Sequence, residues 1–186
     1  MSITTPLISL EEFLQLPETK PASEYINGEV NQKPMPKSKH SRLQIKICNA
    51  INGVTEGERI AYAFPELRCN FGGRSIVPDI AVLRWEQIEF DRGGEPVDDV
   101  YVAPDWMIEI LSPEQRANRV IEKILYSLNY GCQVGWLLDT SDRSILTFTP
   151  NQAPQLWVGG DRPLIPAFIP LELTTNQVFN WLKMQD

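Results

Sequence analysis

The stretch Ser75–Leu83, "SIVPDIAVL", is an almost continuous apolar run with one carboxylate, Asp79, in its middle directly after Pro78. A second stretch, "DWMIEILSP" at residues 105–113, repeats this pattern with Glu109. A charge buried in apolar packing is costly unless it is paired with an opposite charge or bound to a metal ion. The sequence therefore predicts two buried strands that each carry one acid in need of a partner.

Two such strands commonly lie side by side in one sheet, where adjacent strands are about 4.8 Å apart. This spacing would let Asp79 and Glu109 share one divalent cation, because Mg²⁺ is usually held by one or two carboxylates together with water and phosphate oxygens. The backbone carbonyl of Ile110 is a further candidate ligand. Pro78 lacks a backbone donor and favours an opening in the strand pairing, which would give the acid access to solvent. The alternative is that each acid pairs with a buried arginine or lysine.

The composition is that of one globular domain, covering residues 1–186 with a core from about 9 to 182. The start of the chain lacks the features of a signal peptide, and no apolar window is long enough to span a membrane. The three cysteines show no CxxC spacing, which favours a reducing, cytoplasmic setting. A single histidine argues against a His/Cys zinc site.

The order of predicted elements lacks the strict alternation of a doubly wound fold and favours an α/β fold with a mixed sheet flanked by helices. Capping residues, helical periodicity and terminating glycines or prolines predict helices at residues 9–16, 38–53, 112–131 and 173–184. Alternating or continuous apolar runs predict strands at residues 23–33 (a hairpin around Asn27-Gly28), 59–71, 74–83, 105–111, 133–139, 144–149 and 154–158.

Basic side chains follow helical spacing on two of these helices, although the net charge of −7 argues against broad coating of nucleic acid. Residues 31–55 contain no acid, and a local patch there can act despite the acidic total. Its basic members are Lys33, Lys37, Lys39, Arg42 and Lys46. On the helix after Glu109, the polar flank of the apolar stripe holds Arg116, Arg119, Lys123, Tyr126 and Tyr130. Lys123 could there lean over the acids and stabilise charge on a phosphate, whereas the alternative is a solvated helix face.

Several ordered segments together resemble the restriction-endonuclease family of the PD-(D/E)xK nuclease superfamily, in the form expanded in cyanobacteria. They are Pro78-Asp79, "IEILSP" around Glu109, "EKILYSLNYG" with Lys123 and Tyr126, "SEYINGEV", "KPMPKSKH" and "YGCQVGWLLD". The superfamily commonly has a lysine two residues after the second acid, where this chain has Leu111. The family looks like one in which this lysine has moved to the following helix, which makes Lys123 the substitute.

The resemblance implies a restriction endonuclease-like fold and Mg²⁺- or Mn²⁺-dependent hydrolysis of DNA phosphodiester bonds. Asp79 and Glu109, with the carbonyl of Ile110, would be metal ligands, and Lys123 would position or activate the nucleophile. Glu29 matches the family's acid after the hairpin turn and would serve a second metal or its water. Its spacing alone fits an exposed hairpin residue equally well, and Glu24 is a weaker candidate for the same role.

The resemblance also suggests which residues would bind DNA. His40 would contact a phosphate or take part in proton transfer, although an exposed histidine at a helix start fits the sequence equally well. The other predicted contacts to DNA are Lys39, Arg42, Lys46, Arg116, Arg119 and Tyr126. By analogy with nucleases that cut both strands, a homodimer is expected.

Two other functions remain open at this level. A degenerate nuclease fold kept as a partner-binding module is favoured by the acidic net charge, by Leu111 and by the lack of an appended DNA-recognition domain. Hydrolysis of a small phosphoester would need only the same metal site. It predicts that neutralising Lys39, Arg42 and Lys46 leaves activity intact, whereas a nuclease would bind DNA more weakly.

Overall fold

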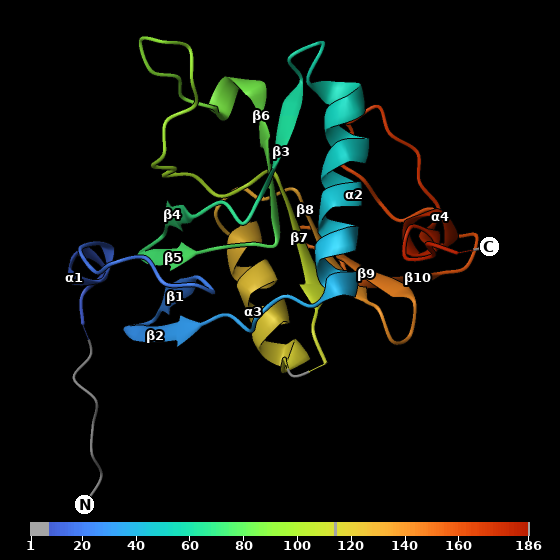
Figure 1. The fold of residues 1–186 in the computed structure, drawn as a ribbon, viewed down its shortest axis with the longest axis horizontal. Coiled ribbons are helices and arrows are strands. Elements are labelled where there is room, and N and C mark those ends of the chain that lie inside the picture. The colour runs from blue at the N-terminus through green and yellow to red at the C-terminus, as the bar shows by residue number, and fades with distance from the viewer. Residues whose placement is uncertain (1–7, 114, 186) are drawn as a thin grey trace, which may run out of the picture.

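The fold consists of helices and strands arranged around two sheets (Figure 1), in a computed structural model that describes residues 8–113 and 115–185. The helices are α1 Leu10–Leu14, α2 Ser38–Thr55, α3 Ala117–Leu128 and α4 Thr175–Asn180, with a short 3₁₀ turn η1 at Trp85–Gln87. The strands are β1 Ser23–Ile26, β2 Glu29–Gln32, β3 Ala61–Pro65, β4 Cys69–Phe71, β5 Arg74–Ile76, β6 Ile80–Arg84, β7 Trp106–Leu111, β8 Val134–Asp139, β9 Ser144–Phe148 and β10 Gln155–Val158. None of the described helices is long and apolar enough to cross a membrane.

The larger sheet is mixed and has six strands in the order β10-β9-β8-β7-β6-β3. Its neighbours pair antiparallel except β7 and β8, which are parallel because α3 connects them as a crossover. The smaller sheet has four antiparallel strands in the order β2-β1-β5-β4. The predicted α/β architecture, a mixed sheet flanked by helices, is therefore confirmed.

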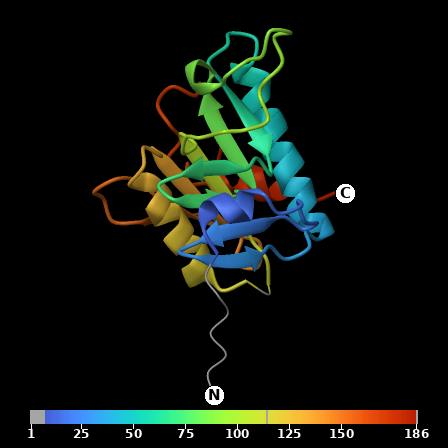
Figure 2. The ribbon, with the colours of Figure 1, turned by 90° about the vertical axis from the view of Figure 1, so that its left-hand side faces the viewer.

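Helices cover both faces of the six-stranded sheet (Figure 2). Successive side chains of a strand point to opposite faces, and the two apolar cores follow this alternation. Ile80 and Ile108 pack in the core that contains the buried side chains of α2 and α4. Ala81 and Met107 pack in the second core, together with Val120 and Ile124 of α3. Glu109 follows Ile108 in β7 and therefore lies on the face that α3 covers.

The prediction of a single sheet was incomplete, because two predicted strands each divide between the sheets. The stretch 59–71 breaks at Glu66, which has a positive φ of 50° and leaves β3 in one sheet and β4 in the other. The stretch 74–83 breaks at 77–79, between β5 and β6. Pro78 cannot donate a hydrogen bond to a ladder. The break places Asp79 where the chain passes from the smaller sheet to the larger one.

Helix ends differ from the predictions in several places. The capping box of Ser9 and Glu12 is present at α1 as predicted. Helix α2 continues through Gly53 to Thr55, because an isolated glycine lowers helix stability without ending the helix. Helix α3 begins at Ala117 rather than near Ser112, whose backbone N–H instead donates to the side chain of Gln115 in a preceding turn. Helix α4 is shorter than the predicted 173–184.

Candidate active site

Glu109 lies within β7, whereas Asp79, which was predicted inside a strand, lies just outside one. Asp79 directly precedes β6, which pairs antiparallel with β7 so that Ile80 lies opposite Ile108. Each acid is only 1% exposed. Oδ2 of Asp79 accepts a 2.7 Å hydrogen bond from the backbone N–H of Ile110. That N–H, rather than the Ile110 carbonyl predicted as a metal ligand, is the group that contacts Asp79, so the ligand role of the carbonyl stays a prediction.

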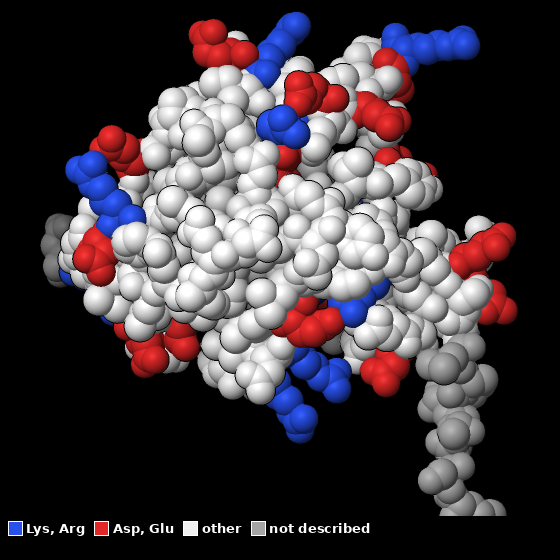
Figure 3. Space-filling view, turned by 180° about the vertical axis from the view of Figure 1, so that it is seen from behind, with Lys and Arg blue, Asp and Glu red and all other residues white. Residues whose placement is uncertain are grey.

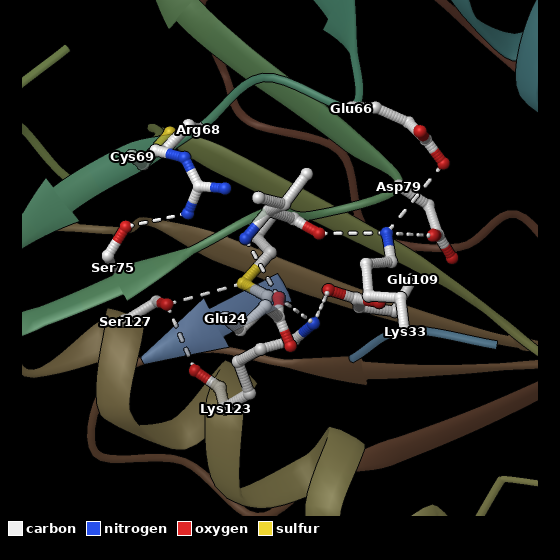
Figure 4. A network of polar contacts seen from close by, with 12 residues as sticks. Glu24, Lys33, Glu66, Arg68, Cys69, Ser75, Asp79, Glu109, Lys123 and Ser127 are labelled. Carbon is white, nitrogen blue, oxygen red and sulfur yellow. Dashed lines mark hydrogen bonds and ion pairs between the residues drawn. The ribbon is translucent and has the colours of Figure 1, made fainter. Parts of the chain in front are cut away.

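Lys123 reaches from α3 to Glu109, and it also contacts an acid of the smaller sheet (Figure 4). Its Nζ lies 2.8 Å from Oε1 of Glu109 and 2.8 Å from Oε1 of Glu24 on β1. The same oxygen of Glu24 accepts a 2.8 Å hydrogen bond from the backbone N–H of Val77. Lys123 therefore links α3 to Glu109 of β7 and to Glu24 of β1, and Glu24 links β1 to the break between β5 and β6.

A glycine lets α3 approach the sheet closely enough for this contact. A Cβ added to Gly135 on β8 would lie 2.2 Å from Cγ2 of Ile124, the residue after Lys123. Any side chain at this position would push the helix away or force Ile124 into another conformation. The glycine in the segment "YGCQVGWLLD" thus has a direct structural role next to the site.

Asp79 is surrounded by groups of α2 and of the segment that joins β2 to α2. Nζ of Lys33 lies 2.7 Å from its Oδ1 and 2.8 Å from the carbonyl oxygen of Val77. Nε2 of His40 lies 3.3 Å from the same Oδ1, and the side chain of Gln44 donates to the Asp79 backbone carbonyl at 2.7 Å. His40 is buried rather than exposed, and its contact is with the acid.

The two acids have opposite pKa shifts. Burial raises the pKa of Asp79, but the charge of Lys33 and the nearby His40 outweigh it and hold this pKa well below its ordinary value. Burial also raises the pKa of Glu109, to about 7, because the lowering by Lys123 is smaller and the charge of Asp79 raises it further. Burial lowers the pKa of Lys123, but the charges of Glu109 and Glu24 dominate and leave it above its ordinary value. Asp79 is thus ionised, whereas Glu109 exchanges a proton near neutral pH.

The residues at the site fit a divalent cation that is held by few protein ligands. Oε1 of Glu109 is buried and accepts no hydrogen bond of normal geometry, although Lys123 is close to it. The described residues contain no group of three or more His, Cys, Asp or Glu side chains placed to hold a metal. Two carboxylates completed by water and substrate oxygens are the usual set for Mg²⁺, but not for a structural zinc site.

A cleft of about 620 Å³ lies between the β1–β2 hairpin and α3, and neither Asp79 nor Glu109 lines it. Glu24, Lys33 and Lys123 line it and are shared with the acid site, and Arg116 and Arg119 line it from α3. Glu29 also lines the cleft, but it is an exposed residue of β2 opposite Ile26. The N-terminal acid that joins the lysine of α3 is therefore Glu24, which the sequence favoured less than Glu29.

The remaining predicted DNA-binding residues do not line this cleft. Lys39, Arg42 and Lys46 are turned away from His40 on α2 by helical periodicity, and Arg42 donates to the carbonyl oxygens of Trp181 and Lys183 at the end of the chain. The ring of Tyr126 packs against Arg74, whose guanidinium carbon is 3.5 Å from the ring centroid. The hydroxyl of Tyr126 donates a hydrogen bond to the carbonyl oxygen of Gly72. The charged side chains seen in Figure 3 lie around the rim of a largely uncharged face.

The fold and the acid pair define a restriction endonuclease-like domain. The sequence matches the Uma2 family, described as "Putative restriction endonuclease", over residues 10–178, and the chain belongs to this family. The crystal structure of "a putative nuclease belonging to DUF820" from Anabaena variabilis has a chain 44% identical in sequence. Its fold matches this one with a TM-score of 0.92, and the match covers 95% of this chain and 99% of that chain. None of the curated proteins matches. These relationships support a nuclease function in general terms.

Proposed function

We propose that this chain is an endonuclease that hydrolyses DNA phosphodiester bonds with the help of Mg²⁺ or Mn²⁺. The observation that carries the proposal is the burial of Asp79, directly before β6, and of Glu109 in the adjacent strand β7, with Lys123 2.8 Å from Glu109. Buried acids of this kind are expensive to maintain and are concentrated at functional sites. Membership of the family supports the same conclusion.

Each residue of the site has a separate task in this proposal. Asp79 and Glu109 would hold the cation, which when bound would polarise the scissile phosphate and lower the pKa of a water molecule. Lys123, fixed by Glu109 and Glu24, would orient the attacking water and stabilise the negative charge that develops on the phosphate. Arg116 and Arg119 hold the backbone of the substrate in the cleft, without selecting its sequence.

Relaxation of supercoiled plasmid DNA in the presence of Mg²⁺ or Mn²⁺ tests this function. Asp79→Asn, Glu109→Gln and Lys123→Met should each lower the nicking rate by about a hundredfold or more. Asp105→Asn is the matched control, because Asp105 is equally buried at 1% exposure but pairs with Arg84 outside the site. Equal rates in wild type and Asp79→Asn would contradict the proposal, and cleavage of RNA in place of DNA would correct its substrate.

A partner-binding module without catalysis is the second candidate, and one observation favours it. Both acids are buried, and a lysine balances the charge of each one. Nζ of Lys33 lies 2.7 Å from Asp79, and Nζ of Lys123 lies 2.8 Å from Glu109. A folded wild type that binds no Mn²⁺ and leaves plasmid intact would support this candidate. The homodimer expected by analogy is likewise a proposal, which sedimentation velocity can test.

A further inference from the structure

Lys33 holds the position at which a metal ion would have to contact Asp79. Its Nζ is 2.7 Å from Oδ1 of Asp79, 2.8 Å from the carbonyl oxygen of Val77 and 3.9 Å from Oε1 of Glu66 (Figure 4). Only 7% of the Lys33 side chain is exposed. The other oxygen of Asp79 already accepts the N–H of Ile110. Oδ1, which Nε2 of His40 also approaches at 3.3 Å, is therefore the oxygen that both a cation and the lysine would use.

We propose that Lys33 is a built-in counter-ion that competes with the divalent cation for Asp79, so that the cation binds only when the ammonium group leaves. The inference rests on the proposed function, because it concerns the same metal site. A divalent ion contacts a carboxylate oxygen at about 2.1 Å, and two cations on one buried oxygen repel each other strongly. In the absence of metal, the ammonium group of Lys33 neutralises the buried negative charge of Asp79, which would otherwise be costly.

The ammonium group has a place to go without any change in the fold. Lys33 lines the cleft of about 620 Å³, so rotation of its side chain would move the charge from Asp79 toward that space. Its backbone stays anchored, because its N–H donates to the carbonyl oxygen of Ala22 at 2.9 Å. The displaced ammonium would then face the compartment that also contains Arg116 and Arg119, where an anionic substrate would lie.

Calorimetric titration of Mn²⁺ into wild type, Lys33→Met and Lys39→Met tests the competition. Lys39→Met makes the same change in charge at an exposed position of α2 and serves as the matched control. Lys33→Met should bind Mn²⁺ at least about tenfold more tightly than wild type, whereas Lys39→Met should bind like wild type. Affinity in Lys33→Met that equals or falls below that of wild type would overturn the inference.

Chemical labelling of the unmodified protein provides a test that does not depend on a variant. Acylation of lysines, quantified by mass spectrometry, should be slow at Lys33 without Mn²⁺ and several-fold faster when Mn²⁺ saturates the site, with Lys39 unchanged. Continued protection of Lys33 in the saturated protein would overturn the inference while leaving the proposed function intact. If neither wild type nor Lys33→Met binds Mn²⁺, the proposed function itself fails.

Discussion

Glu109 should make the metal-free protein less stable as the pH rises from about 4.5 to 7. Burial and the charge of Asp79 raise its pKa from 4.5 to about 7 in spite of Lys123. The folded state therefore binds more protons than the unfolded state in this range, and by linkage the free energy of unfolding falls with increasing pH. The full shift corresponds to roughly 3 kcal/mol. Below pH 4.5 and above pH 7 this contribution is constant.

Urea unfolding in EDTA, followed by tryptophan fluorescence between pH 4.5 and 8, measures this effect. Glu109→Gln carries no titrating carboxyl, so wild type should lose up to roughly 3 kcal/mol relative to this variant as the pH rises. The comparison cancels the other charged groups around Glu109, which are Lys33, Asp79, Lys123 and Glu24. A stability difference that is the same at every pH would refute the reasoning, because it would mean that Glu109 has no raised pKa.

Three further predictions concern the supports of the site. Gly135→Ala should lower the free energy of unfolding by about 1–3 kcal/mol, because its Cβ would collide with Ile124. The control is Gly53→Ala in α2, which has open space around the new Cβ and should raise the free energy of unfolding by about 0.5–1 kcal/mol. Both variants are measured by urea unfolding, and stabilisation of both would contradict the packing argument. Glu24→Gln should cost about 1–3 kcal/mol through weaker hydrogen bonds to the lysine of α3 and to the backbone, and an unchanged melting temperature would contradict this. Glu29→Gln should leave Mn²⁺ affinity unchanged in calorimetry because Glu29 is exposed, and a clear loss of affinity would restore its predicted role at the metal.

The acid pair could be predicted because its signals are local in the sequence. A carboxylate inside an apolar strand is visible in the residues themselves, and two central strands are expected to lie side by side. Helical spacing placed Lys123 on the polar flank of the apolar stripe, where a solvated helix face was the alternative, and the resemblance to the nuclease family singled this lysine out. In the structure Lys123 contacts Glu109, and Asp79 directly precedes the strand next to that of Glu109, whereas the roles of the three residues stay predictions.

Other features depend on contacts between distant segments, which the sequence does not display. The division of 74–83 between two sheets depends on β1 pairing with β5, although Pro78 indicated an opening there. Glu24 and Glu29 are both hairpin acids, and only the placement of the hairpin against α3 decides which one meets Lys123. Lys33 belonged to a basic segment in the sequence, and nothing local indicated that its charge would be buried on Asp79.

The most direct test of the central claim is the anomalous difference map of a crystal soaked in Mn²⁺. The account predicts a peak within about 2.1–2.3 Å of carboxylate oxygens of both Asp79 and Glu109, with Nζ of Lys33 no longer on Oδ1 of Asp79. A map without a peak between the two acids, with Lys33 still 2.7 Å from Asp79 at saturating Mn²⁺, would contradict it.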